Sequence, residues 1–276
     1  MSIAIVTDST ADIPVELAEK NQIHVVPNLV IIDGQSLEDG VSISRKEFYQ
    51  RLPDMPSPPT TATASSGVYQ QLYAKLIQQG ATKIFSIHAS SLLSGIINAA
   101  STAAQAFSGK VSVIDSEQVS LGLGFQVLAA AEAVLRGASF DAVQRLINDV
   151  RKRVHLIAML DTLEYVRRSG RVSWARARLG NLLNIKPFVE VSSGRVLNRG
   201  EARTRHKGVE RLKEFLRSLG ALERLAVLHT NAEADAIQFL KDLNFELPTS
   251  PLVINVTTVI GTHAGPNALG FAAIVK

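Results

Sequence analysis

Short apolar runs alternate with amphipathic segments through the first half of the chain. Continuous or alternating apolar runs predict strands, and apolar residues that recur every three or four positions predict helices. Strands separated by helices of this length are typical of a parallel sheet covered on both faces. The predicted strands are 3–7, 24–32 (at a sheet edge or broken by Pro27), 83–88 and 110–115, and the predicted helices are 67–79, 94–107, 121–136 and 140–154.

Single residues mark two further helices and a loop in this half. We expect Asp12 to cap a helix that has Pro14 in its first turn. Ser44 is followed three residues later by Glu47, which is the spacing of a capping box at a helix start. Residues 53–66 are rich in Pro, Ser and Thr, so we expect them to form a loop.

The pattern changes after Val154, where strands outnumber helices. A hairpin is predicted from 184–191 and 195–197 across the turn Ser193-Gly194. The sequence therefore predicts an α/β protein of two domains, a Rossmann-like parallel-sheet domain at 1–155 and an α/β domain with a mixed sheet at 156–276. The other predicted elements of the second half are strands 155–160, 224–229, 252–258 and 270–275 and helices 207–219 and 232–243.

Composition narrows the class of protein. The chain has 276 residues, which is long for one hydrophobic core, and it has no cysteine, which excludes disulfides, thiolate zinc sites and cysteine nucleophiles. The first residues carry no basic segment before their apolar run and are read as a strand, not a signal peptide. The most apolar stretch, 121–135, contains Gln126 and Glu132 and is too short to span a bilayer. We expect a cytoplasmic protein.

Charge is distributed unevenly along the chain. Residues 1–150 hold 9 basic and 14 acidic residues, whereas residues 151–276 hold 20 basic and 11 acidic residues. A basic half is consistent with an anionic substrate, an acidic partner, a membrane surface or nucleic acid. Nucleic acid is the weakest of these, because no nucleic-acid-binding fingerprint is present and few aromatic residues accompany the arginines.

Small polar segments follow several predicted strands, which is where open parallel sheets bind ligands. Ser94-Gly95 opens a predicted helix whose free N–H groups suit an anion, although a simple helix cap explains the pair equally well. No dinucleotide, Walker A, nucleophile-elbow or His-Glu-x-x-His motif is present, and the six histidines are scattered, so a metal site has little support. The polar segments are 7–10, 60–63, 90–95, 115–116 and 261–266.

One histidine and several arginines are further candidates. We expect His263, flanked by Thr262 and Gly265-Pro266, to sit in a rigid turn that a ligand can approach closely; an exposed turn residue is the alternative. Arginine side chains are suited to bind a carboxylate or a phosphate. The alternative interpretation is that they only form a solvated basic face of the protein. These arginines are 167, 168, 171, 203 and 205.

Taken together and in order, these segments resemble the DegV family over nearly the whole chain. The matching pieces are DSTADIP at 8–14, TTATAS at 60–65, SSLLSG at 90–95, VIDSEQVSLGLG at 113–124, LEYVRRSGRVS at 163–173, NIKPFVEV at 184–191 and GTHAGPNALG at 261–270. The resemblance implies two α/β domains with a long-chain fatty acid (C14–C18, such as palmitate) between them and no other cofactor. It also implies a non-catalytic subunit of a bacterial fatty acid kinase, whose separate catalytic subunit makes an acyl-phosphate for phospholipid synthesis, with transient membrane contact.

The same resemblance implies roles for individual residues. Thr61, Ser94 and His263 would hold the lipid carboxylate, with backbone donors at Gly95 and Thr262. Arg171, together with Arg203 or Arg205, would contact the phosphate or the kinase. The family pattern is altered beside this site at Ala62 and Ile96, where polar side chains are more usual.

Two other functions stay open on the sequence. The first is a stand-alone kinase or phosphatase of a small acid or ketone, because the fold resembles the dihydroxyacetone-kinase group, in which a histidine binds substrate. The missing Walker A motif disfavours this enzyme but does not exclude it, since other kinases lack that loop. The second is an interaction or regulatory protein whose ligand is only structural.

Overall fold

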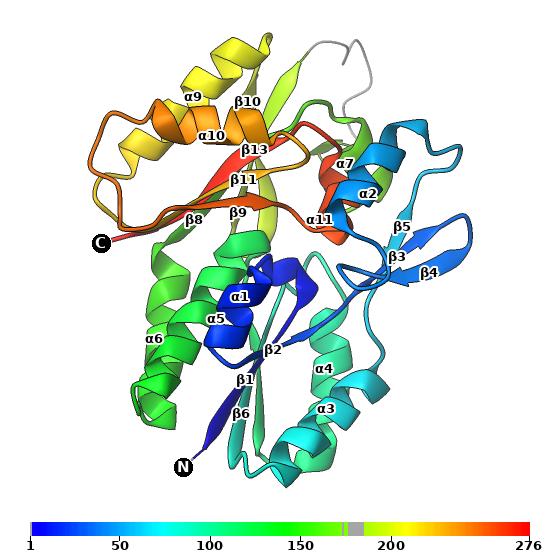
Figure 1. Ribbon diagram of the computed structural model, residues 1–276, viewed down its shortest axis with the longest axis vertical. Helices are drawn as coiled ribbons and strands as arrows, with labels where there is room; N and C mark the ends of the chain where they lie inside the picture. Colours follow the sequence, from blue (N-terminus) through cyan, green and yellow to red (C-terminus); the bar gives the residue numbers. More distant parts are fainter. Residues whose placement is uncertain (1, 173, 176–184) are drawn as a thin grey trace.

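The computed structural model describes residues 2–172, 174–175 and 185–276, and these form two lobes stacked along the long axis (Figure 1). The lower lobe is built on a parallel sheet with the strand order β2-β1-β6-β7. Helices α3 and α4 lie on one side of this sheet, and α5 and α6 lie on the other (Figure 1). The elements are β1 (Ile3–Asp8), α1 (Val15–Lys20), β2 (Ile23–Val26), α3 (Ser66–Gln78), β6 (Lys83–His88), α4 (Ile96–Ala104), β7 (Val111–Asp115), α5 (Ser120–Leu135) and α6 (Phe140–Arg153).

The upper lobe is built on a six-stranded sheet with the order β10-β9-β8-β13-β11-β12. Only β11 and β12 pair in parallel, so the sheet is mixed. Helices α9 and α10 cover its outer face, and its inner face lies toward the lower lobe (Figure 1). The elements are β8 (Val154–Met159), α7 (Glu164–Ser169), β9 (Lys186–Ser192), β10 (Arg195–Ala202), α9 (Arg205–Ser218), β11 (Leu222–His229), α10 (Glu233–Lys241), β12 (Leu252–Asn255), α11 (Thr258–Ala264) and β13 (Leu269–Val275).

A small antiparallel sheet with the order β4-β3-β5 projects beside α2 and α11 (Figure 1). The sequence did not predict it. The run 24–32 is broken at Pro27, as one of the two predicted alternatives had it, so that β2 joins the parallel sheet and β3 joins this one. The segment 53–66, expected to be a loop, supplies the short edge strand β5. The elements are β3 (Leu29–Ile32), β4 (Gln35–Glu38), α2 (Arg45–Arg51) and β5 (Thr60–Ala62), and three short 3-10 turns are η1 (Ser9–Ala11), η2 (Leu52–Asp54) and η3 (Gln105–Phe107).

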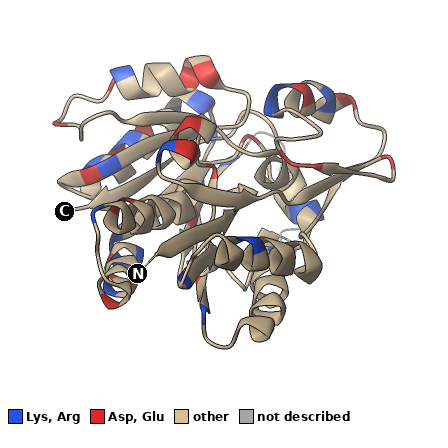
Figure 2. Cartoon of the chain, turned by 60° about the horizontal axis from the view of Figure 1, so that its bottom comes forward, with Lys and Arg blue, Asp and Glu red and all other residues tan. Residues whose placement is uncertain are grey.

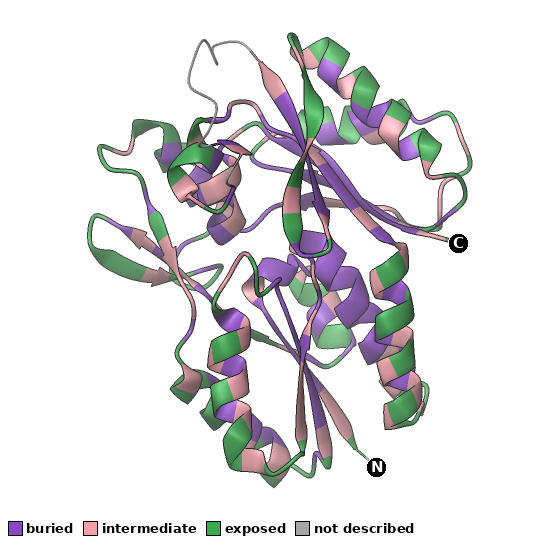
Figure 3. Cartoon of the chain, turned by 180° about the vertical axis from the view of Figure 1, so that it is seen from behind, coloured by how far each residue is buried: buried purple, intermediate pink, exposed green. Residues whose placement is uncertain are grey.

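Helix α5 joins the two lobes. It contacts β1 and β6 of the lower sheet and β8 and β13 of the upper sheet, which explains why its sequence is apolar on every face (Figure 3). Gly124 permits the close approach, because a Cβ atom there would lie 2.4 Å from the carbonyl oxygen of Ala11. At the rim of this contact, Arg224 of β11 forms a bidentate ion pair with Glu132 at 2.5 and 3.0 Å. No helix within the described ranges is long and apolar enough to cross a membrane.

Most predicted elements are confirmed, including the parallel first sheet, the mixed second sheet and the hairpin of β9 and β10. Residue 184, the first of the predicted hairpin, lies outside the described residues. The predicted helix start at Ser44 is confirmed by its cap bond, in which the backbone N–H of Glu47 donates to Ser44 Oγ at 3.1 Å. Charged side chains lie mainly on the outer helices and loops (Figure 2). The division at residue 155 stays a proposal, supported by the change from the lower to the upper sheet between α6 and β8.

The prediction for Asp12 is wrong. Helix α1 begins after Pro14 without a side-chain cap, and Asp12 instead ends the 3-10 turn η1 in the left-handed conformation. Its carboxylate points into the protein, where it accepts hydrogen bonds from Ser120 Oγ at 2.5 Å and from the backbone N–H of Thr257 at 2.8 Å. Asp12 therefore joins the two lobes and does not cap its own helix.

Candidate functional site

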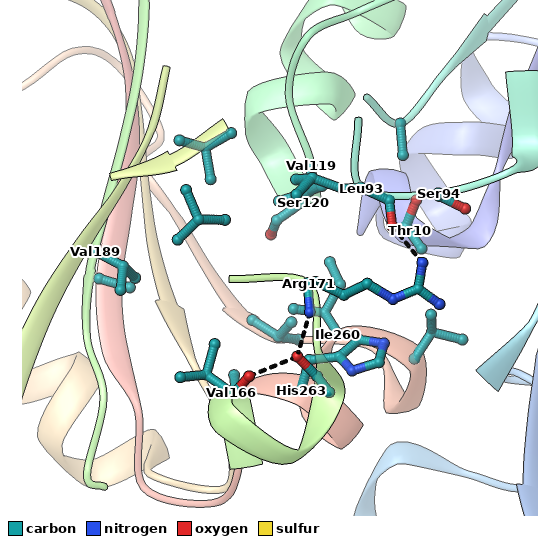
Figure 4. Close-up of a pocket in the computed structure, with 18 of the residues that line it drawn as sticks. Thr10, Leu93, Ser94, Val119, Ser120, Val166, Arg171, Val189, Ile260 and His263 are labelled. Atoms are coloured by element: carbon teal, nitrogen blue, oxygen red, sulfur yellow. Dashed lines mark hydrogen bonds between the residues drawn. The ribbon is translucent and has the colours of Figure 1, made fainter. Parts of the chain in front are cut away.

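A cavity of about 220 Å³ lies between the inner face of the six-stranded sheet and the lower lobe (Figure 4). Its walls are mostly apolar and come from both lobes, with Val119 from the lower lobe and Val189 from β9 among them. A single water needs about 10–15 Å³ of such volume, so the cavity is many times larger than a one-water site. An apolar interior of this size suits a slender hydrocarbon chain.

Two residues that are 202 positions apart meet at the polar end of the cavity. Thr61 Oγ1 lies 3.1 Å from His263 Nε2, and both side chains line the cavity. Thr61 is held by β5, which pairs with β3 in the register Thr61 to Val30. His263 lies in the last turn of α11, so the prediction that it sits in a rigid turn is wrong, although the prediction that Thr61 and His263 share a site is supported by this contact.

The imidazole of His263 is neutral at physiological pH. Burial lowers its pKa to about 4, with the nearby Arg171 guanidinium adding to the effect. A neutral imidazole carries one N–H donor and one acceptor nitrogen, and the Thr61 hydroxyl can complement either tautomer. The other ring nitrogen, Nδ1, is buried without a hydrogen-bond partner among the described residues. The pair can therefore offer a hydrogen-bond donor to a ligand without carrying a fixed positive charge.

Helix α11 is positioned at its other end by two buried carboxylates from the first lobe. Asp12 accepts from the backbone N–H of Thr257 at 2.8 Å, and Asp39 accepts from the N–H of Thr258 at 3.1 Å. These bonds satisfy N–H groups that a helix start leaves free. The Tyr49 hydroxyl donates to the carbonyl of Val256 at 2.9 Å. Residues of the N-terminal half of the chain thus fix the position of α11, the helix that carries His263.

Glycine lets α11 pack directly on Tyr49. A Cβ atom at Gly261 would lie 2.3 Å from the Tyr49 hydroxyl, closer than two non-bonded heavy atoms can approach. Arg45 completes the contact, since its guanidinium donates to the carbonyl of Asn255 and lies 3.6 Å from Asp12 Oδ1. The glycine of the G-T-H segment therefore lets this helix lie directly against the tyrosine ring.

Ser94 and Gly95 lie at the start of α4, and both line the cavity. Gly95 is the capping residue of the helix, and the Ser94 hydroxyl oxygen accepts from the N–H of Ile96 at 3.4 Å. Since that oxygen accepts, its hydrogen stays available to a ligand. The first N–H groups of α4 have no carbonyl partner within the helix, so this helix start adds positive dipole to the polar end of the cavity.

Arg171 spans the mouth of the cavity between the lobes. It follows α7 of the upper lobe, and its guanidinium donates to the carbonyl of Leu93 in the lower lobe at 3.0 Å (Figure 4). Its backbone N–H donates to Ser169 Oγ at 3.2 Å, which fixes the start of the side chain. Arg171 is exposed and its side chain lines the cavity next to Ser94 and His263, while its predicted contact with phosphate or the kinase stays a prediction.

Three other predicted residues do not reach the cavity. Thr262 lies within α11 and does not line the cavity, so its role as a backbone donor stays a prediction; its hydroxyl donates to the carbonyl of Thr258 at 2.9 Å. Arg205 is held in a structural network, with Nε donating to Asp235 at 2.6 Å and Nη1 donating to the carbonyl of Asn267 at 2.7 Å. Arg203 is exposed and lies away from the cavity lining.

Sequence reasoning also missed polar residues that line the cavity. Asn28, Ser120 and His229 are all buried and contribute to the wall. The backbone N–H of Ala232 donates to His229 Nδ1 at 3.1 Å, which places the hydrogen of the neutral ring on Nε2. None of the three lies in the five polar segments singled out from the sequence. Within the described ranges, no group of three or more acidic or histidine side chains could hold a metal ion.

Asp12 and His263 have opposite effects on stability in weak acid. Burial raises the pKa of Asp12 to about 6, against the opposing charge of Arg45, while the pKa of His263 falls to about 4. In the unfolded chain Asp12 would have a pKa of 3.8 and His263 a pKa of 6.5. Between about pH 4 and 6, Asp12 therefore binds more protons in the folded state than in the unfolded state, whereas His263 binds fewer. As the pH rises, Asp12 lowers the free energy of unfolding and His263 raises it, each by on the order of 3 kcal/mol.

Replacing either residue should therefore change the pH dependence of stability in opposite directions. Relative to the wild type, Asp12→Asn should gain stability as the pH rises from about 4 to 6, and His263→Asn should lose it. Urea unfolding of the three proteins across this range measures both differences. Stability curves of either variant that run parallel to the wild-type curve would contradict the assigned pKa values.

Comparison with known proteins gives one consistent result. The family model described as "Uncharacterised protein, DegV family" matches residues 2–276. A DegV domain-containing protein of Deinococcus radiodurans is 38% identical over 279 residues, covering 99% of this chain and 98% of the relative. A DegV family protein from Thermus thermophilus, described as binding fatty acid, has a TM-score of 0.91 at 33% identity, with both chains covered fully. Bacillus subtilis DegV, described as a fatty acid binding protein, has a TM-score of 0.88 at 33% identity, again over both whole chains. The chain belongs to the DegV family.

Proposed function

We propose that this chain binds a long-chain fatty acid in the cavity between its lobes and presents the carboxylate to a separate kinase subunit. The product is an acyl-phosphate that feeds phospholipid synthesis, and the chain itself is a carrier without catalytic activity that works in the cytoplasm. The observation that carries the proposal is an apolar cavity that ends at the Thr61 and His263 pair. Relatives described as fatty acid binding support the same ligand class.

The polar end has the chemistry that a buried carboxylate needs. A carboxylate taken out of water is strongly destabilised unless several hydrogen-bond donors satisfy it. Thr61 and Ser94 offer hydroxyl groups, neutral His263 offers a ring N–H, and the helix start at Gly95 offers backbone N–H groups. Because these donors are neutral, they can hold the head group without a permanent ion pair, and one carboxylate oxygen stays free to attack a phosphoryl group.

The apolar walls have the chemistry that the tail needs. Each buried methylene contributes about 0.8 kcal/mol, so a sixteen-carbon chain would contribute on the order of 10 kcal/mol before entropy losses. The walls are formed by side chains of both lobes, such as Val119, Leu156 and Val191, and no polar motif is required to recognise them. Shape therefore selects the tail, which is why the sequence carries no signal for this part of the site.

Two arginines are suited to the kinase side of the reaction. Arg171 lies at the mouth, where a positive charge can stabilise the phosphate that approaches the carboxylate. Arg203 is exposed on the same lobe, and we assign it to partner contact. The guanidinium of Arg205 is already engaged by Asp235, so we place Arg203 before it in this role. A brief contact with the membrane would supply the acid.

Purified protein should carry one equivalent of a C14–C18 fatty acid. The acid should survive purification because the tail is enclosed by both lobes. Mass spectrometry of an organic extract, quantified against protein concentration, measures it. An extract without fatty acid, from protein that also fails to take up added palmitate, would contradict the proposed ligand.

An acyl-phosphate assay on the same purified protein distinguishes a carrier from a stand-alone enzyme. With ATP and fatty acid alone, the protein should form no acyl-phosphate, and addition of a fatty acid kinase catalytic subunit should start the reaction. Turnover by the chain alone would contradict the carrier role and favour an independent kinase.

Removing one head-group donor should weaken fatty acid binding without unfolding the protein. Thr61→Val keeps the shape of the side chain and removes its hydroxyl, and His263→Asn removes the imidazole. Each should reduce palmitate affinity roughly ten- to a hundredfold, the usual worth of a hydrogen bond to a charged group. Fluorescent fatty acid displacement measures the affinity.

Thr60→Val is the matched control for Thr61→Val. Thr60 is the exposed neighbour in β5, and successive residues of a strand point to opposite faces. Its replacement should leave affinity unchanged. Equal affinity in wild type, Thr61→Val and His263→Asn would remove both residues from the site.

A further inference from the structure

Asn28 is a buried amide whose orientation is fixed by its neighbours. It follows β2 with 1% of its surface exposed and lines the cavity. Its Nδ2 group donates to Asp8 Oδ1 at 3.0 Å. Because an ionised carboxylate only accepts hydrogen bonds, the NH₂ group must face Asp8, and the amide oxygen must face away from it.

Asp8 is held firmly enough to impose this orientation. Its carboxylate is fully buried, where it also accepts from His88 Nδ1 at 2.9 Å and from the backbone N–H of Thr10 at 3.0 Å. Burial raises the pKa of Asp8, but the hydrogen bond and charge of His88 outweigh burial, so the pKa lies below its usual value. The backbone of Asn28 is fixed as well, since its N–H donates to Ser9 Oγ at 3.1 Å.

The amide oxygen of Asn28 has no donor within the described part of the chain. Oδ1 is buried and unpartnered. The hydroxyls of Thr10 and Ser120, which also line the cavity, are engaged elsewhere, because Thr10 donates to Asp8 and Ser120 donates to Asp12. A carbonyl oxygen can only accept, and neither a carboxylate nor a hydrocarbon tail carries a donor. A ligand that satisfies this atom must bring an O–H or N–H group of its own.

The position of Asn28 in the fold indicates where along the ligand its O–H or N–H group would lie. Strand β3 begins at the next residue and pairs with β5, with Leu29 opposite Ala62 and Val30 opposite Thr61. Continued by one residue beyond the strands, this register would place Asn28 opposite Thr63, two residues from Thr61. Two residues of a strand span about 7 Å, so the Asn28 oxygen lies a few carbon–carbon bonds from the head-group site.

We propose that Asn28 determines ligand specificity by accepting a hydrogen bond from a hydroxyl group near the carboxyl end of the bound acyl chain. The ligand class is a long-chain hydroxy acid with its hydroxyl within the first few carbons. This inference rests on the proposed function, since it requires that the carboxylate binds at Thr61 and His263. Beyond the proposed function, it assigns to the polar part of the cavity the recognition of a hydroxyl group as well as the carboxylate.

Competition between matched acids tests the inference. Delipidated protein is loaded with an equimolar mixture of hexadecanoic acid and 3-hydroxyhexadecanoic acid, and the bound ratio is measured by mass spectrometry. The wild type should favour the hydroxy acid roughly three- to tenfold more than Asn28→Leu does, which is the usual worth of one neutral hydrogen bond. With 16-hydroxyhexadecanoic acid, whose hydroxyl is at the far end of the tail, wild type and Asn28→Leu should show the same ratio.

The outcomes separate this inference from the proposed function. If Asn28→Leu binds one equivalent of hexadecanoic acid and its ratio for 3-hydroxyhexadecanoic acid equals that of the wild type, the role of Asn28 is wrong and the carrier function stands. If the substitution weakens both acids equally, Asn28 supports the shape of the cavity and does not recognise the hydroxyl, and the specificity role is again wrong. Failure of the wild type to bind any acid overturns both proposals. Asn28→Ala, which introduces no added bulk, replaces Asn28→Leu should that variant fail to fold.

Discussion

The site depends on one short helix being held at both ends by residues of the N-terminal half of the chain, from the lower lobe and from the small sheet beside it. Asp12 and Asp39 bind the backbone at the start of α11, and Thr61 contacts His263 in its last turn. A seven-residue helix has little stability of its own, so these contacts, with the packing of Gly261 on Tyr49, determine where the imidazole lies. Each contact joins residues about 200 positions apart in the chain. The polar end of the cavity therefore exists only when the two lobes are docked.

The second constraint is that the lobes must dock firmly and still leave a space. Helix α5 provides the firm contact, because it is buried against both sheets and is anchored to β11 by the ion pair between Glu132 and Arg224. Beside it, most of the side chains that line the cavity are valines, leucines, isoleucines and alanines, which leave it unfilled. The same apolar surface can thus stabilise the fold away from the cavity and hold a hydrocarbon chain inside it. Neutral donors at one end fix the direction in which such a chain would enter.

The sequence predicted the elements whose signals are local, and it missed those that depend on distant partners. The alternation of apolar runs and helical periods predicted the two large sheets, and the resemblance of seven segments predicted the meeting of Thr61 with His263. The small sheet was missed because β5 has only three residues and β3 continues an apolar run across Pro27. Asp12 and Arg205 were misassigned because a capping position and a basic cluster are readable in sequence, whereas their partners Thr257 and Asp235 are not. Asn28 gave no signal at all, since its role follows from Asp8 beside it in space.

A crystal structure with a bromine-labelled acid would test the central claim most directly. With 16-bromohexadecanoic acid, the account predicts a carboxylate within hydrogen-bond distance of Thr61, Ser94 and His263. The anomalous signal of bromine should lie deep between the lobes, toward Val189, which is on the far side of the cavity from Ser94 in Figure 4. A bromine signal at the Thr61 end, or lobes packed together with no space for the chain, would contradict it.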